Sequence, residues 1–167
     1  GEPLLHKDIG EFIKKIKELG FAVKLDTNGS FPERLQSLID GGLLDYIAMD
    51  IKNCKEKYGI SAGADIDISN IEKSVELIKN SNIPHEFRTT VTKELHAEED
   101  IISISLWLGK NEKYYLQQFK DSGDILCEGC SAHHENDLIK MYEKKGWDKN
   151  GVPYCIDWAN RQLVLAK

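Results

Sequence analysis

Charged residues interrupt mostly apolar stretches of the sequence at positions where they could bind a ligand. Asp26 follows the stretch at 21–25, and Asp50 and Lys52 lie near the end of the stretch at 46–51. Charges next to apolar strands are costly unless they are paired or functional. Two carboxylates and one ammonium group on neighbouring strand ends could hold a zwitterion, with a small cation offsetting the carboxylates. We therefore predict a site for a small charged ligand. A structural ion pair at Asp50 is the alternative.

A second group of chemically competent residues lies near the C-terminus. Its members have the types and local spacing of a zinc site or an iron site, because two cysteines form a CxxC pair and two histidines follow at once. The alternative is a loop with two thiols and a histidine pair at the start of a helix. The group comprises Cys127, Cys130, His133, His134 and Cys155.

Helices and strands must alternate to position these residues. Apolar periodicity and turn residues predict helices at 9–19, 32–40, 69–80 and 97–108, and strands at 21–25, 46–51, 85–92 and 114–119. This alternation predicts an α/β fold with a parallel sheet, either doubly wound or part of a (β/α) barrel. Ligands bind beyond the carboxyl ends of the strands in such folds, where Asp26 and Asp50 lie.

Local signals complete the expected organisation. Ser69 with Glu72 three residues later predicts a capping box at the start of a helix. Glycines at 59 and 63 predict a loop over 53–67. After residue 120 the pattern changes to a polar loop, a short helix near 135–145, and a terminal strand or hairpin at 154–165. We read residues 1–120 as the main domain and 121–167 as its C-terminal appendage.

Composition excludes several classes of function. The 167 residues contain 22 Lys+Arg and 28 Asp+Glu, so the formal net charge is −6. This acidity argues against a nucleic-acid partner held by bulk charge. No apolar run approaches the roughly 20 residues that cross a bilayer, and no signal peptide opens the chain. Four cysteines in such a chain fit a reducing compartment, so we expect a cytoplasmic protein without a membrane partner.

Five short motifs occur in this order at βα spacing: GEPLL at 1–5, LDTNG at 25–29, AMDIK at 48–52, FRTTV at 87–91 and YYLQQF at 114–119. Together they resemble the radical S-adenosylmethionine activases of glycyl radical enzymes, most of all the activating proteins of anaerobic ribonucleoside-triphosphate reductases. The resemblance covers residues 1–120. It implies a partial TIM-like (β/α) barrel of the radical SAM type, without the N-terminal strands and with a small C-terminal appendage.

The resemblance also implies S-adenosylmethionine as cofactor and suggests which residues contact it. Gly1, Glu2 and Pro3 match the end of the family's loop that binds the methionine amino group. Asp26 and Asp50 match positions that face the methionine moiety and, together with Thr27, a monovalent cation. The remaining expected cofactor contacts are Asn28, Lys52 at the carboxylate or ribose, Arg88 and Gln117.

The iron–sulfur centre of this family is a 4Fe-4S cluster on a CxxxCxxC loop upstream of the GEP motif, and the sequence contains no such loop. We therefore expect a fragment of a parent activase. In the parent, the resemblance implies that a 5′-deoxyadenosyl radical forms a glycyl radical on an anaerobic ribonucleotide reductase, with flavodoxin or ferredoxin as electron donor. The fragment alone is expected to be inactive. It is also expected to self-associate, because missing strands would expose a sheet edge.

Other functions fit parts of the same pattern. The parent could activate a pyruvate formate-lyase type enzyme, or could be a radical SAM enzyme that acts on a small molecule or a modified base. A non-catalytic binding module that keeps the barrel without the cluster is an alternative from another class. A CxxxCxxC motif upstream in the same reading frame would favour the enzymes.

Overall fold

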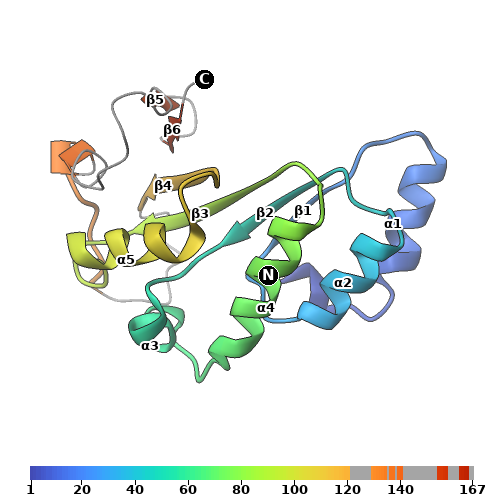
Figure 1. Cartoon of the computed structure of the whole chain (residues 1–167), viewed down its shortest axis with the longest axis horizontal. Coiled ribbons are helices and arrows are strands. Elements are labelled where there is room, and N and C mark those ends of the chain that lie inside the picture. The colour runs from blue at the N-terminus through green and yellow to red at the C-terminus, as the bar shows by residue number, and fades with distance from the viewer. Residues whose placement is uncertain (121–128, 135, 138, 141–153, 158–161, 166–167) are drawn as a thin grey trace. The chain divides into compact units, whose positions relative to one another are not determined.

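The computed structural model describes residues 1–120, 129–134, 136–137, 139–140, 154–157 and 162–165 (Figure 1). The chain divides into two compact units, which are described separately below. Unit 1 comprises Gly1–Asp50 and Ile66–Phe87, and unit 2 comprises Ile51–Asp65 and Arg88–Lys167. The fold class is α/β with a parallel sheet, as the alternation of elements predicts.

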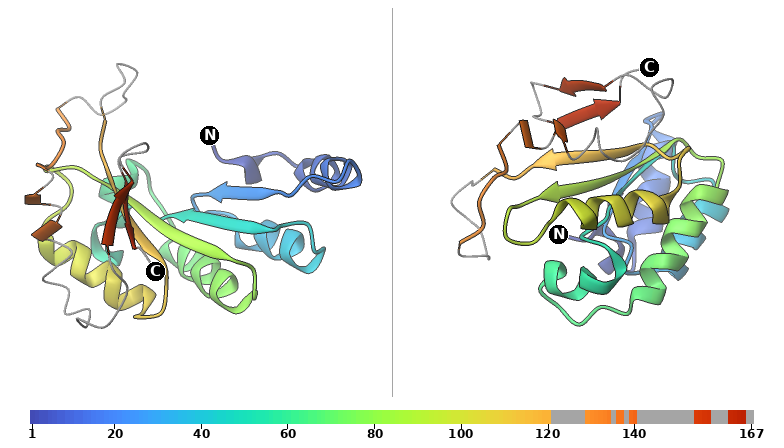
Figure 2. Two further views of the ribbon diagram at one scale, coloured as in Figure 1. Left: turned by 90° about the horizontal axis from the view of Figure 1, so that it is seen from above. Right: turned by 60° about the vertical axis from the view of Figure 1, so that its left-hand side comes forward.

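Unit 1 is built on parallel strands. β1 (Lys24–Thr27) pairs with β2 (Tyr46–Asp50) in parallel, with Asp26 opposite Ala48. β2 also neighbours β3 (His85–Val91), whose first three residues belong to this unit. The helical elements of unit 1 are η1 (Pro3–Leu5), α1 (Ile9–Glu18), α2 (Pro32–Asp40) and α4 (Ile68–Asn80). The left view of Figure 2 shows α2 and α4 on the same side of β1 and β2.

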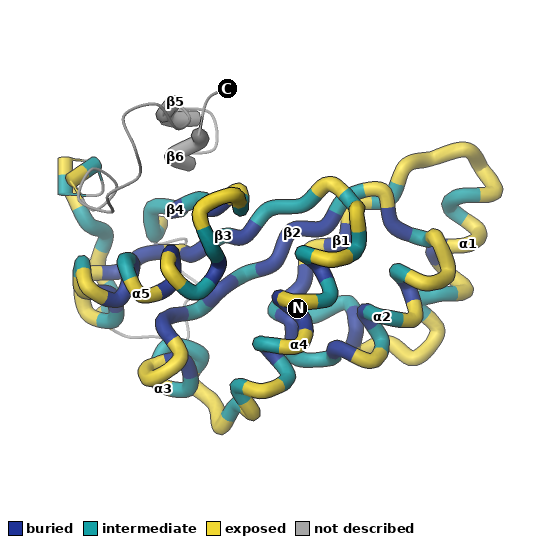
Figure 3. Tube along the Cα trace, viewed as in Figure 1, coloured by how far each residue is buried: buried dark blue, intermediate teal, exposed yellow. Residues whose placement is uncertain are grey.

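The core of unit 1 forms where helices cover one face of these strands. Successive side chains of a strand point to opposite faces, and in β1 Leu25 and Thr27 are buried whereas Lys24 and Asp26 are exposed. Figure 3 shows the middle of β2 buried and α1 largely exposed. The helices contribute the buried side chains of Ile13, Leu35, Leu38, Ile71, Val75 and Ile78. One face of the β1–β2 pair is therefore apolar and covered, and the other is polar.

Unit 2 contains the last four residues of β3, followed across the sheet by β4 (Tyr114–Gln118), β6 (Gln162–Leu165) and β5 (Tyr154–Asp157). β6 is antiparallel to both β4 and β5, so the terminal strand or hairpin predicted at 154–165 corresponds to two antiparallel strands. The helical elements are η2 (Lys55–Lys57), α3 (Tyr58–Ala62) and α5 (Glu98–Leu108). No described helix in either unit is long and apolar enough to cross a bilayer.

Most predicted elements are confirmed, but three local predictions are wrong. The predicted loop at 53–67 contains η2 and α3, because Gly59 lies inside α3 and only Gly63, with φ of 64°, ends it. The predicted capping box is wrong because Asp67 caps α4 and its carboxylate accepts the Ser69 N–H at 3.0 Å. The strand predicted at 21–25 begins three residues later, at Lys24.

Two predictions fall partly outside the described residues. Most of the helix predicted near 135–145 belongs to the part of the chain that the structure does not describe, as do residues 121–128. The boundary between residues 120 and 121 stays a prediction.

Candidate functional site

A connected set of polar side chains covers the open face of the strands in unit 1. The Lys24 ammonium lies 3.5 Å from a Glu86 carboxylate oxygen and 3.8 Å from an Asp26 oxygen. It also lies 5.4 Å from the centre of the Tyr46 ring, and the Tyr46 hydroxyl donates to Glu86 at 2.9 Å. Asp50 is two residues beyond Ala48, the partner of Asp26, so both carboxylates share this face near the carboxyl ends of their strands.

Glu2 connects the N-terminal segment to the end of β1. One oxygen of its carboxylate accepts the Leu4 N–H at 3.1 Å and the Thr27 hydroxyl at 2.9 Å. The other oxygen accepts the Asn28 N–H at 2.6 Å. We call these four residues the Glu2 network. It brings the GEP motif to the LDTNG motif, although 25 residues separate Glu2 from Thr27.

The Glu2 network changes the expected tasks of two predicted site residues. Three donors already use the Glu2 carboxylate, which leaves it less available to an ammonium group. Thr27 is 4% exposed, and its hydroxyl also accepts the Gly29 N–H at 3.1 Å. Alternation places the Thr27 side chain on the opposite face of β1 from Asp26. The cation site predicted at Asp26, Thr27 and Asp50 stays a prediction.

Further contacts fix the turn after β1 and the N-terminal segment. Gly29 has φ of 77°, and a Cβ atom there would meet the side chains of Met49 and Ser74. The Ser74 hydroxyl donates to the Gly29 carbonyl at 2.7 Å. The Arg34 guanidinium donates to the carbonyls of Leu4 and Leu5. Glycine is needed at position 29 both for its positive φ and for space.

Unit 2 contains the other three predicted cofactor contacts, Lys52, Arg88 and Gln117. The Ile51 N–H donates to the Arg88 carbonyl at 2.7 Å, so the main chain next to Lys52 lies beside Arg88. Two residues along β3, the Thr90 hydroxyl donates to the Gln117 side chain at 3.3 Å. Arg88 and Thr90 lie on the same face of β3 by alternation.

Sequence reasoning missed the polar residues that hold the segment after β2. Asn53 is fully buried, and its amide donates to the Ser61 hydroxyl at 2.7 Å and to the Leu95 carbonyl at 2.8 Å. The Asn53 side-chain oxygen accepts the Cys54 N–H at 2.7 Å. A ring nitrogen of His96 lies 2.8 Å from the Lys52 carbonyl. Apart from the adjacent Cys54, these partners are eight to 44 residues apart, so no local pattern could have revealed them.

Asp100 anchors the start of α5 to the same segment. Its carboxylate accepts the Ala97 N–H at 2.9 Å and the Lys57 ammonium at 2.8 Å, and lies 3.6 Å from the Cys54 thiol. Burial acts to raise the pKa of Asp100, but the bonds from Lys57 and Ala97 outweigh it and the pKa is lowered. Burial raises the pKa of Cys54, which favours the unreactive thiol over the thiolate.

The described part of the C-terminal group lies beside the ends of β3 and β4. Ala132 forms an isolated antiparallel bridge with Thr92, and the Gln118 amide donates to the His133 carbonyl at 3.0 Å. The Glu94 carboxylate accepts the Ser131 N–H at 2.8 Å and the Ser131 hydroxyl at 2.5 Å.

The zinc or iron site predicted in this group stays a prediction. Cys127 and the side chain of Cys155 lie outside the described residues. Among the residues that the structure does describe, no three potential metal ligands come together. His134 is exposed, and Cys130 is half-buried.

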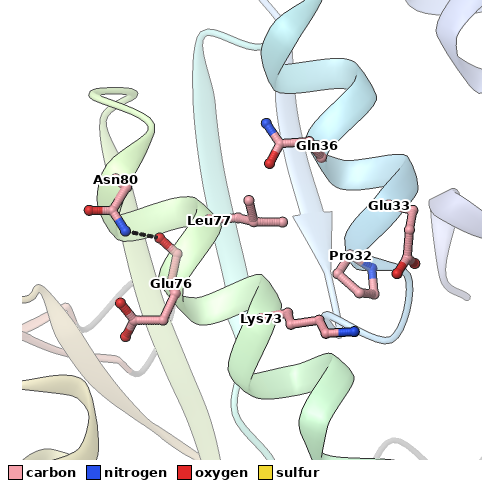
Figure 4. A pocket seen from close by; sticks show the side chains of 7 residues that line it. All are labelled: Pro32, Glu33, Gln36, Lys73, Glu76, Leu77 and Asn80. Atoms are coloured by element: carbon pink, nitrogen blue, oxygen red, sulfur yellow. Dashed lines mark hydrogen bonds between the residues drawn. The ribbon is translucent and has the colours of Figure 1, made fainter.

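A groove of about 500 Å³ lies between α2 and α4 in unit 1 (Figure 4). Leu77 and Pro32 provide its apolar surface, and the Asn80 amide donates to the Glu76 carbonyl at 2.8 Å on its rim. None of the predicted site residues is among the residues that line this groove. The complete lining is Pro32, Glu33, Gln36, Lys73, Glu76, Leu77 and Asn80.

Comparison with known proteins gives the family and a relative. Residues 1–103 match the family model described as the radical SAM superfamily. The chain is 37% identical over 148 residues to the "Putative glycyl-radical enzyme activating enzyme MJ1227" of Methanocaldococcus jannaschii. This alignment covers 84% of the chain and 62% of that protein, so the chain spans less than two thirds of its relative.

Solved structures share the fold at low sequence identity. A structure of TYW1 with a lysine-pyruvate adduct bound has a TM-score of 0.75 at 16% identity, covering 99% of this chain and 54% of that one. A domain of a pyruvate-formate lyase-activating enzyme from Bacteroides vulgatus has a TM-score of 0.64 at 16% identity, covering 86% and 87% of the two chains. At this identity the likeness shows the fold alone.

Proposed function

Because the chain belongs to the radical SAM superfamily, we propose that it is the S-adenosylmethionine-binding part of an enzyme that activates a glycyl radical enzyme. The 37% identity to a protein named as such an activating enzyme supports the reaction class. The likeness of the LDTNG and AMDIK motifs to reductase activators supports an anaerobic ribonucleotide reductase as the partner, with flavodoxin or ferredoxin as electron donor.

One observation carries the proposal: the Glu2 network attaches the GEP segment to the end of β1 in the unit that contains Asp26 and Asp50. An ammonium group needs oxygen acceptors, and the carbonyls of residues 1–3 together with these carboxylates supply them. In unit 2, Lys52 and Arg88 supply the cations that a carboxylate requires. The residues present therefore fit the charges of the methionine moiety.

The residues proposed to hold the cofactor bind and orient it. When it is bound and reduced through an iron–sulfur cluster, S-adenosylmethionine supplies a carbon radical that can remove a hydrogen atom from a glycine. The main-chain carbonyls and Asp26 would orient the ammonium end, and Lys52 would orient the carboxylate or the ribose. The full set is Gly1, Glu2, Pro3, Asp26, Thr27, Asn28, Asp50, Lys52, Arg88 and Gln117.

The cysteines of this chain do not fit a 4Fe-4S cluster of this family. The sequence contains Cys54, Cys127, Cys130 and Cys155, and none of them forms a CxxxCxxC motif. Cys54 is buried, and burial raises its pKa. We therefore propose that residues outside these 167 hold the cluster. Treating this chain with iron and sulfide under dithionite should give no 5′-deoxyadenosine, and its formation would contradict this assignment.

Isothermal titration calorimetry of the 167-residue chain with S-adenosylmethionine tests the cofactor site. We expect saturable binding that Asp26→Asn or Lys52→Ala weakens by at least about fivefold, because each loses a charge-assisted contact. Asp8→Asn is a matched control, since Asp8 is exposed and makes no side-chain capping bond. Failure of the unsubstituted chain to bind would contradict the proposed function.

The partner is tested in a protein that combines this chain with a CxxxCxxC loop. Anaerobic incubation with S-adenosylmethionine and an anaerobic ribonucleotide reductase should give the electron paramagnetic resonance doublet of a glycyl radical. A radical that forms on a pyruvate formate-lyase type enzyme instead would transfer the assignment to that class. Cofactor cleavage without any protein radical would favour a small-molecule or modified-base substrate.

Self-association is also proposed for this chain. β1 is the terminal strand of the order β1-β2-β3 in unit 1, and edge strands readily pair with another chain. Phe12, Leu19 and Phe21 in the same unit are 57%, 74% and 64% exposed. Light scattering at high concentration should detect a dimer or larger species. A clean monomer, unchanged by Phe21→Ser, would contradict the proposal.

A further inference from the structure

We propose that His96 is a positioning residue for S-adenosylmethionine, because its ring fixes the main chain at Lys52 and so directs the Lys52 side chain toward the cofactor. The inference rests on the proposed function, since it assumes that Lys52 contacts S-adenosylmethionine. No motif of the sequence points to His96, which lies 44 residues beyond Lys52 and two residues before α5.

Both ring nitrogens of His96 are used, and only one tautomer satisfies them. The Thr92 N–H donates to Nδ1 at 3.2 Å, so Nδ1 must carry the lone pair. The proton therefore lies on Nε2, which donates to the Lys52 carbonyl at 2.8 Å. The His96 N–H also donates to the Thr92 carbonyl at 3.1 Å, so a main-chain bond holds His96 within the loop after β3.

The main chain on either side of the Lys52 carbonyl is fixed by other buried groups. The Tyr114 hydroxyl donates to the Thr89 hydroxyl at 2.8 Å, and Thr89 donates to the Ile51 carbonyl at 2.7 Å. On the other side, the buried amide of Asn53 bonds to Leu95 and Ser61. With the bond from His96, polar groups of three consecutive residues are hydrogen-bonded: Ile51, Lys52 and Asn53.

Lys52 needs this support more than a shorter side chain would. β2 ends at Asp50, so Lys52 lies two residues beyond the end of the strand. Its ammonium group lies on a flexible four-carbon stem, and a fixed Cα position removes one source of that freedom. Small displacements of a ligand-orienting group reduce its effect strongly.

The burial of His96 argues that the fold uses its polarity. The residue is 3% exposed, and burying an imidazole has a desolvation cost that an apolar residue of similar volume would avoid. The charged or titratable groups that act on the ring are Asp100 and His133, in addition to its two main-chain partners. An apolar residue of similar volume would pack in the same space but would not donate a hydrogen bond to the Lys52 carbonyl.

Calorimetric titration of the 167-residue chain with S-adenosylmethionine at pH 7.5 tests the proposal. We expect His96→Leu to weaken binding about 5- to 10-fold, the effect of one lost hydrogen bond. His96→Gln should remain within about threefold, because its amide offers one acceptor and one donor. His85→Leu is the matched control, since His85 is a half-buried histidine that contacts the Ile83 carbonyl in unit 1.

A double-mutant cycle separates positioning from general stabilisation. In a Lys52→Ala background, His96→Leu should weaken binding by less than about twofold, because the side chain that it positions is already gone. Equal effects of His96→Leu with and without Lys52, or no effect at all, would overturn the proposal. No binding by the unsubstituted chain would instead contradict the proposed function.

A second measurement keeps the proposal testable if His96→Leu does not fold. Long-range ¹H–¹⁵N spectra of the unsubstituted chain should show a neutral His96 ring with its proton on Nε2, before and after addition of S-adenosylmethionine. A proton on Nδ1 would mean that the Lys52 carbonyl receives no bond from the ring, and would overturn the proposal.

Discussion

The Glu2 network and the segment around Lys52 both hold the main chain near a strand end by hydrogen bonds, but the first uses a charged group and the second uses neutral groups. In unit 1, a half-buried carboxylate gathers two N–H groups and a hydroxyl. In unit 2, Asn53 and His96 are only 0% and 3% exposed. They form their hydrogen bonds with a neutral amide and a neutral imidazole. A charge strengthens hydrogen bonds where water still reaches it, whereas a neutral group avoids the large cost of burying a charge.

This difference predicts which perturbations each region resists. The Glu2 network depends on a negative charge and on the shape of the turn at Gly29. The segment around Lys52 depends on complete hydrogen bonding in a buried space, so it should respond to lost partners and to protonation. Substitutions in each region can therefore test the comparison, and the expected effects decrease in the order given below.

The largest effect is expected from Gly29→Ala, which tests the shape of the turn in unit 1. Alanine would strain the backbone at φ of 77° and would press its Cβ atom against Met49 and Ser74. We expect a loss of about 3 kcal/mol in the free energy of unfolding, from strain and overpacking together. Gly20→Ala is the control, because Gly20 has φ of 85° but open space around it. Equal losses in urea unfolding would show that space at Gly29 is irrelevant.

A smaller loss is expected from Asn53→Ala in unit 2. The substitution removes two donors and one acceptor, and leaves the buried Cys54 N–H and the Leu95 carbonyl without their partner. Unsatisfied buried groups predict a loss of about 2 kcal/mol in urea unfolding. Asn80→Ala serves as control, because the exposed Asn80 amide bonds within its own helix and its loss should cost less than about 0.5 kcal/mol. A similar loss from both variants would show that the buried hydrogen bonds of Asn53 stabilise the fold no more than those of an exposed side chain.

The fold was largely predictable because its signals are local. Apolar periodicity gave α1, α2 and α4, and the short apolar runs gave four strands. The wrong predictions of the capping box and of the loop at 53–67 have local causes as well. Asp67 and Ser69 are both good N-cap residues two positions apart, and Glu72 favours the wrong one as a capping box. The short helix α3 contains Gly59 and is too brief for a clear amphipathic period.

The candidate site was predictable only in part. Parallel topology and the family resemblance gave Asp26, Asp50 and Lys52, because strand ends are visible in the sequence. The contacts that support them were not visible, since Glu2 meets Thr27 across 25 residues and His96 meets Lys52 across 44. Such pairings depend on how the chain folds back on itself, and a single sequence contains no local signal for them.

Glu2→Gln tests the charge that the Glu2 network uses. Glutamine keeps one acceptor oxygen, but its NH₂ group must then face at least one of the present donors. We expect a loss of about 1 to 2 kcal/mol in urea unfolding, because a charge-assisted bond is replaced by two opposed donors. Glu33→Gln is the control, since Glu33 is exposed on α2 in the same unit. If both variants unfold at the same urea concentration, the Glu2 carboxylate does not stabilise the turn.

The smallest effect at neutral pH is expected from the protonation of His96, and it separates the two regions most directly. Burial lowers the pKa of His96 below the ordinary value of 6.5. The ring is therefore neutral in both states well above pH 6.5, and its contribution to stability is complete there. As the pH falls through 6.5 the unfolded chain takes up a proton that the folded chain refuses, so stability falls toward the lower folded pKa. The loss between pH 7 and pH 6 is at most about 0.7 kcal/mol, the value for a folded histidine that takes up no proton.

Urea unfolding at pH 7 and pH 6 measures this loss. The pH dependence should shrink in His96→Gln, which cannot titrate, and should persist in Glu2→Gln, because its change lies in the other unit. Asp100 adds no slope in this range, since its pKa is lowered and its stabilising charge is lost only in more acidic solution. A pH dependence that is identical in the unsubstituted chain and in His96→Gln would show that the buried imidazole does not depend on its neutral form. The contrast between a charged network in one unit and a neutral one in the other would then lose its physical basis.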